Sequence, residues 1–104
     1  MELRNPPDAV FKALADGTRR QIITALLEQP MPVHALTDRF EISRPAVSKH
    51  LRVLGEAGLV MARRAGKENV YALDVAGLQQ VRDWLDRFWG ERLQVLKSLA
   101  ERRM

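Results

Sequence analysis

The side chains with the clearest chemical use lie close together in residues 43–54. Ser43 is a good helix-capping residue, and Pro45 fits the first helical turn, where its missing N–H breaks no hydrogen bond. In such a helix the apolar residues Val47, Leu51 and Leu54 share one face, so the basic and hydroxyl side chains cover the other. The segment therefore predicts a helix with one buried face and one exposed cationic face.

The exposed face offers hydrogen-bond donors that suit duplex DNA. Arginine and lysine donate to guanine O6 and N7, serine donates to a base or a phosphate, and proline contacts a thymine methyl group. We therefore predict a DNA-recognition helix over residues 43–57. Its candidate contact residues are Ser43, Arg44, Pro45, Ser48, Lys49 and Arg52. Which of them meet bases and which meet phosphates is left open by residue type and spacing.

Catalytic and metal-binding patterns are weak in this chain. Ser48 and His50 lie two residues apart on the predicted helix and point in different directions, so the histidine cannot activate that serine. Glycines are scattered and form no phosphate-binding loop. There is no cysteine, and His34 is far from His50, whereas zinc wants about four cysteine, histidine or carboxylate ligands. We expect no enzyme activity, no cofactor and no metal site, with His34 a surface residue and His50 in a packed or capping role.

The flanks of the recognition helix predict a winged helix-turn-helix. Upstream, residues 33–40 form a short helix, and only Glu41 and Ile42 separate it from the cap of the next. Downstream, Gly58 ends the recognition helix. The wing that follows is a strand over residues 59–64, a turn over 65–69 and a strand over 70–73.

The predicted wing is basic. Residues 44–67 hold six basic side chains against the single acid Glu56, a local net charge of +5 in a chain whose net charge is +4. Such a confined patch is typical of a surface that neutralises phosphates. We predict that Arg63, Arg64 and Lys67 hold the DNA backbone and supply affinity without sequence preference. A protein-interaction module with an acidic partner is the alternative, and it would lack the steep salt dependence of DNA binding.

Two helices are predicted before the helix-turn-helix. Asp8 follows two prolines at the start of the first, and Asp16 caps the second, over residues 17–28. Arg19 and Arg20 lie near the positive end of that second helix, which is unfavourable for them. We expect these two arginines to be solvated, or else to reach a phosphate or an acid.

A long helix without proline is predicted over residues 74–102, with Asp74 as its cap. Three of the six aromatic residues fall between Trp84 and Trp89. They form an apolar stripe that needs a partner, and a second chain is favoured over burial within the same chain because so small a domain has few elements to cover it. A sensor that responds to a small ligand or to a metal at an unrecognised site is a further alternative, and an apolar ligand would be held by Trp84, Phe88 and Trp89.

The order of several segments resembles the ArsR/SmtB family of bacterial transcriptional repressors, over about residues 8–100. The matching segments are Phe11-Lys12-Ala13-Leu14-Ala15-Asp16-Gly17-Thr18-Arg19-Arg20, Ser43-Arg44-Pro45-Ala46-Val47-Ser48-Lys49-His50-Leu51, Leu54, Gly58-Leu59-Val60 and Tyr71. Glu41 departs from the usual helix-turn-helix pattern, in which glycine is common at the turn. Metal-sensing members use cysteines before the turn or histidines and carboxylates of the last helix. In this chain the segment before the turn has no cysteine, and the last helix has no histidine.

The resemblance implies a two-fold dimer built on the first and last helices. The candidate interface residues are Phe11, Leu78, Val81, Trp84, Leu85, Phe88 and Trp89. A dimer places two recognition helices in major-groove segments about 34 Å apart, on a pseudo-palindromic site. We therefore expect a single chain to bind this DNA weakly.

Length and composition set the overall expectation. A chain of 104 residues makes one domain. We expect this domain to be mainly α with a small β-hairpin. It would be a dimeric winged helix-turn-helix with its elements in the order α-α-α-α-β-β-α. Its parts are N-terminal helices (8–28), helix-turn-helix (33–57), wing (59–73) and C-terminal dimerisation helix (74–102). With no apolar run long enough for a membrane span or a leader, we expect a cytoplasmic protein. The predicted function is a homodimeric, metal-independent repressor that binds an inverted-repeat DNA operator, its effector unknown.

Overall fold

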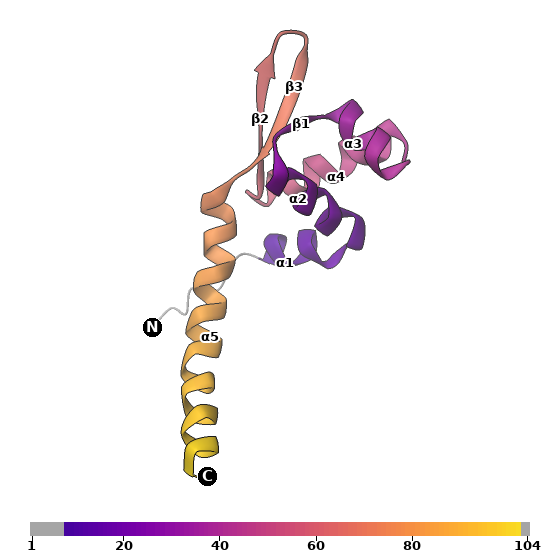
Figure 1. Cartoon of the computed structure of the whole chain (residues 1–104). Coiled ribbons are helices and arrows are strands. Elements are labelled where there is room, and N and C mark those ends of the chain that lie inside the picture. Colours follow the sequence, from indigo (N-terminus) through magenta and orange to yellow (C-terminus); the bar gives the residue numbers. More distant parts are fainter. Residues whose placement is uncertain (1–7, 103–104) are drawn as a thin grey trace.

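The computed structural model describes residues 8–102, with the side chain of Phe88 excepted. The elements are, in order, α1 (Asp8–Ala15), α2 (Gly17–Glu28), β1 (Met31–Pro32), α3 (Val33–Phe40), α4 (Arg44–Glu56), β2 (Val60–Ala65), β3 (Glu68–Leu73) and α5 (Val75–Arg102). Helices α1 to α4 gather beside the base of the sheet, and α5 leaves this body as a long arm (Figure 1). The described chain accordingly measures 60 × 34 × 21 Å.

The core joins one apolar face from each of the first four helices to the base of the wing. Positions three or four residues apart on a helix share a face, and this spacing brings the apolar residues of α2 and α4 inward. The largest fully buried side chains are Val10, Ile22, Leu36, Val47, Leu51, Leu54 and Leu59. Because the predicted core face of α4 is buried, the opposite face of that helix is turned to solvent.

The turn before α4 and the cap of α4 follow the prediction. The Ser43 Oγ accepts a hydrogen bond from the backbone N–H of Ala46 at 3.2 Å, and Pro45 lies in the first turn. Before it, Glu41 takes the left-handed conformation, with φ 52° and ψ 39°, and its N–H donates to the Thr37 carbonyl at 3.0 Å. Gly58 has φ 78° after the end of α4. Helix α4 therefore begins at a capping serine and ends shortly before a glycine in the left-handed conformation.

The predicted hairpin is confirmed, but its turn is shorter than expected. β2 and β3 pair antiparallel from Val60 opposite Leu73 to Ala65 opposite Glu68, so only Gly66 and Lys67 connect them. The prediction of a turn over residues 65–69 was therefore wrong. Gly66 has φ 63°, a conformation that lets a two-residue turn match the twist of the strands.

A third strand, β1, was not predicted. Met31 pairs with Tyr71 and Pro32 with Val70, so the sheet has the order β1-β3-β2. A strand of two residues between two helices has no alternating pattern from which it can be recognised. Its pairing joins the connection between α2 and α3 to the wing.

Arg20 is exposed, as expected, and Arg19 is half-buried, but both side chains also bond carbonyl groups that the sequence did not predict. Arg19 Nε donates to the Ala13 carbonyl at 2.7 Å and its Nη2 to the Lys12 carbonyl at 2.9 Å. Arg20 Nη1 donates to the carbonyls of Leu14 and Ala15, at 2.7 and 3.0 Å. The last carbonyls of a helix lack internal partners, and cations are stabilising near them. The two arginines thus close the end of α1 rather than oppose the start of α2.

The start of α5 is held tightly against the wing. Asp74 caps the helix as predicted, its Oδ1 accepting from the Ala76 N–H at 3.1 Å, while its own N–H donates to the Leu59 carbonyl at 2.9 Å. Gly77 is buried against the backbone of Gly58, so that a Cβ at residue 77 would overlap the Gly58 carbonyl. The direction in which α5 leaves the body is set by this close approach.

Candidate nucleic-acid interface

The outer face of α4 carries the predicted recognition residues. Val47 and Leu54 are 0% exposed on the inner face, which fixes the rotation of the helix about its axis. The side chains turned to solvent are those of Ser43, Arg44, Pro45, Ser48, Lys49 and Arg52. This face therefore presents charged and hydroxyl donors on a rigid helix, which is the form that enters a major groove.

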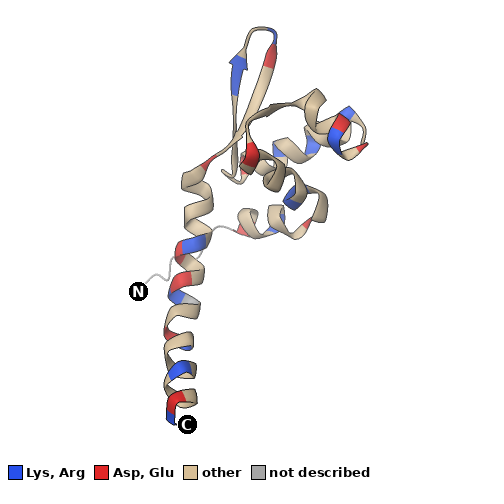
Figure 2. Ribbon diagram, viewed as in Figure 1, with Lys and Arg blue, Asp and Glu red and all other residues tan. Residues whose placement is uncertain are grey.

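The wing adds a second basic surface beside α4. Arg63, Arg64 and Lys67 are exposed. Figure 2 shows basic residues on α4 and at the outer end of the hairpin, where an acidic stretch of β3 lies beside them, and α5 carries both signs of charge along its length. Arg64 Nε donates to the Gly66 carbonyl at 3.0 Å, which ties that side chain to the turn. Together these two surfaces form what we call the basic face: the outer side of α4 and the tip of the wing.

The back of α4 is joined to the start of α2 by a polar junction. His50 Nδ1 lies 3.4 Å from Arg19 Nη1 and 4.0 Å from Asp16 Oδ2. Asp16 also caps α2, and the hydrogen bond from the Arg19 N–H lowers the pKa of its carboxyl below the ordinary value. The sequence predicted a packed His50 but no partner for it. This junction links α4 to the start of α2.

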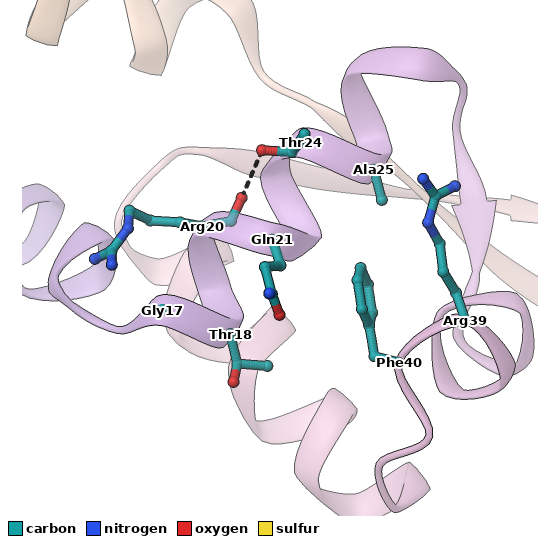
Figure 3. A pocket seen from close by; sticks show the side chains of 8 residues that line it. All are labelled: Gly17, Thr18, Arg20, Gln21, Thr24, Ala25, Arg39 and Phe40. Carbon is teal, nitrogen blue, oxygen red and sulfur yellow. Dashed lines mark hydrogen bonds between the residues drawn. The ribbon is translucent and has the colours of Figure 1, made fainter.

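A hollow of about 600 Å³ lies between α2 and the end of α3. Figure 3 shows Phe40 projecting from α3 toward α2, beside Gln21 and Ala25. Near it Arg39 donates to both oxygens of Glu28, at 3.0 and 3.2 Å; this bond lowers the pKa of Glu28 and raises that of Arg39. The lining does not include the tryptophans of α5, which were weighed as an apolar ligand site.

The apolar stripe of α5 is exposed along most of its length. Phe11 and Trp84 pack edge to face, with ring centroids 5.3 Å apart, and Leu78 and Val81 pack against the core. Beyond them the exposed apolar side chains of this helix are Leu85, Trp89, Leu93, Val95, Leu96 and Leu99. Of the predicted interface residues, Phe88 has a side chain outside the described part of the structure. Burial within the chain thus covers only the first turns of the stripe.

Residues 8–102 also bear on metal binding and membrane insertion. Within this range no three histidine, cysteine or acidic side chains come together as a metal site would require. Nor does any helix in the same range have the length and apolar content needed to cross a membrane.

The fold and the basic face define a winged helix-turn-helix DNA-binding protein. Residues 16–62, which include the helix-turn-helix, match the family model described as "Bacterial regulatory protein, arsR family". The chain is 48% identical over 101 residues to the HTH-type transcriptional regulator Rv2034 of Mycobacterium tuberculosis, covering 97% of this chain and 94% of that protein. It is 35% identical over 79 residues to the transcriptional repressor SdpR of Bacillus subtilis, covering 76% and 88%. The chain therefore belongs to the ArsR family of bacterial transcriptional regulators.

Solved structures agree with this assignment. An ArsR-like transcriptional regulator from Rhodococcus sp. RHA1 superposes with a TM-score of 0.75 at 36% identity, covering 90% of this chain and 89% of that one. A homodimeric winged helix-turn-helix DNA-binding domain from Mycobacterium bovis superposes with a TM-score of 0.65 at 29% identity, covering 93% and 82%. The family confirms the predicted resemblance and fold, and it places the protein among transcriptional regulators and not among enzymes.

Proposed function

We propose that this regulator is a homodimeric repressor that binds an inverted-repeat operator independently of metals. The observation that carries the proposal is the division of α4 into a buried apolar face and an exposed face of donors, with the basic wing tip beside it. In this proposal α4 enters the major groove and Arg44, Ser48, Lys49 and Arg52 meet base edges and nearby phosphates. Arg63, Arg64 and Lys67 meet the backbone and supply affinity that does not depend on sequence.

The exposed stripe of α5 supports the dimer. Trp89 is 47% exposed and Leu93 58% exposed, and soluble monomers rarely leave an extended apolar patch open to water. A two-fold partner would cover the stripe and bring a second recognition helix to the next turn of the duplex, about 34 Å away. The homodimeric relative from Mycobacterium bovis makes a second copy of this chain the proposed partner.

The proposal is tested by fluorescence anisotropy with two duplexes of equal length. One carries an inverted repeat from the region upstream of the gene for this protein, and the other has a scrambled sequence. We expect tighter binding to the first, by about 10³-fold or more, and a steep loss of affinity for both as salt rises. Equal affinity for the two duplexes would contradict a sequence-specific operator. Binding without salt dependence would instead favour a protein partner for the basic face.

A further inference from the structure

A second hollow lies where the helix-turn-helix meets the wing. Its volume is about 140 Å³, and the residues that line it are Pro32, Val33, His34, Arg44, Lys67, Glu68 and Asn69. They come from the start of α3, the start of α4 and the tip of the wing. Two of the side chains are cations, Arg44 and Lys67, and one, Asn69, is a neutral donor. The hollow thus gathers hydrogen-bond donors from both parts of the basic face.

Glu68 is the acid of this hollow, and it is paired. Its Oε1 lies 3.0 Å from Nε2 of His34, and the two side chains are 52% and 58% exposed. His34 belongs to α3 and Glu68 to β3, so the pair crosses from the helix-turn-helix to the wing. An unpaired carboxylate at this place would repel a DNA phosphate, since like charges at close range disfavour each other. The contact with the imidazole ties that carboxylate to α3.

We propose that the hollow seats one phosphate of the DNA backbone, with Arg44, Lys67 and Asn69 as donors, and that His34 is a positioning residue that holds Glu68 away from it. The inference rests on the proposed function and extends it to residues for which the sequence suggested no such role, His34 and Asn69. A cavity of about 10–15 Å³ on this measure already holds one water, so the hollow has room for a phosphate group.

The donors favour a phosphate of DNA over a free anion. Arg44, Lys67 and Asn69 are all exposed, so water competes for each of them and a free ion gains little. A duplex docked on α4 instead presents its phosphates at a high effective concentration. Arg44 is the first residue of α4, and the first turn of a recognition helix is the part that reaches deepest toward the groove. The hollow is therefore placed beside the groove edge.

The phosphate seat is tested by anisotropy on the operator and scrambled duplexes over a range of salt. Lys67→Ala and Asn69→Ala are each expected to weaken binding to both duplexes by the same factor. Lys67→Ala is also expected to lower the log–log salt slope by about one. A loss confined to the operator duplex would show base reading by these residues and overturn the phosphate seat.

The role of His34 is tested by a double-mutant cycle with Glu68. His34→Ala is expected to weaken binding about two- to fivefold, and Glu68→Gln to leave it unchanged or tighter. In the Glu68→Gln background His34→Ala is expected to have no effect, because the charge that it controls is gone. The same loss in both backgrounds would overturn the positioning role. Arg39→Ala and Glu28→Gln remove an exposed pair of the same kind away from the hollow and serve as matched controls with unchanged affinity.

Two further outcomes separate this inference from the proposed function. Inorganic phosphate added to the ¹⁵N-labelled protein is expected to shift residues 67–69 only in the range of about 10 mM or above; binding below about 1 mM without DNA would overturn the DNA backbone as the source. If the wild type binds neither duplex, the proposed function fails. If it binds both and all four variants match it, only the phosphate seat fails.

Discussion

Arg52 and Lys49 are the residues that carry the proposed sequence reading. Both are exposed on the face of α4 opposite Val47 and Leu51, so truncation should leave the fold intact. We expect Arg52→Ala or Lys49→Ala to weaken operator binding by about 1–3 kcal/mol if the side chain reaches a base edge. Competition with scrambled DNA separates base contacts from phosphate contacts. Equal losses of affinity for the operator and for the scrambled sequence would make the residue a phosphate contact. Lys12→Ala, on α1, is the control for loss of an exposed charge.

Glu41 is strained in the turn between α3 and α4. Its φ of 52° is a conformation that costs a residue with a Cβ about 1–2 kcal/mol and costs glycine little. Part of this difference is offset because glycine has more freedom in the unfolded chain. We expect Glu41→Gly to raise the free energy of unfolding by about 0.5–1 kcal/mol, measured by urea denaturation. Glu56→Gly, in the last turn of α4, is the control and should lose stability, by up to about 1 kcal/mol.

The element whose placement depends most on one residue is α5. Gly77 lets its first turn lie on the Gly58 backbone, whereas Gly90 of the same helix has no other atom within 4 Å of an added Cβ. We expect Gly77→Ala to lose about 1–3 kcal/mol of stability because the helix must move off the wing. Gly90→Ala should gain up to about 1 kcal/mol from helix propensity alone. Thermal unfolding followed by circular dichroism compares the two, and a stable Gly77→Ala variant would contradict the close approach.

At the scale of the whole molecule, we propose that two copies of the chain form a dimer. Substitutions in the outer half of α5 test this proposal without disturbing the body formed by the other elements. Leu93 and Leu96 are each 58% exposed, so Leu93→Glu and Leu96→Glu should leave the single chain folded. We expect both to shift sedimentation from dimer to monomer and to weaken operator binding. A wild type that sediments as a monomer at about 50 μM, where a specific interface is saturated, would contradict the dimer. Gln94→Glu, on the opposite side of the helix, is the matched control.

Metal independence is a second proposed property of the whole molecule. The chain has no cysteine, and His34 and His50 lie against Glu68 and Asp16 in different parts of the fold. Zinc requires about four such ligands at one place. We expect operator affinity to change less than tenfold between excess zinc and excess chelator. A larger change, which corresponds to more than about 1.4 kcal/mol of coupling, would reveal a metal site formed by the dimer.

The helices of this protein were predictable because their signals are local. Ser43, Asp16 and Asp74 each cap a helix that begins within two residues of them, and a cap acts on N–H groups two or three residues along the chain. The apolar spacing of α4 likewise foretold which face is buried. The residues proposed to touch DNA follow from the same spacing, since the face opposite a buried face is exposed.

Contacts between distant parts of the chain were decided only by the tertiary structure. Arg19 and Arg20 reach back to carbonyls of α1, Gly77 meets Gly58, and His34 meets Glu68 across 34 positions of sequence. Helix caps and hydrophobic periodicity describe a residue and its near neighbours, so they cannot state which backbone or side chain arrives from another element. The sequence thus determined where each helix begins and which face it buries. How the wing joins the helix-turn-helix, and in which direction α5 leaves, depends on packing that exists only in the folded chain.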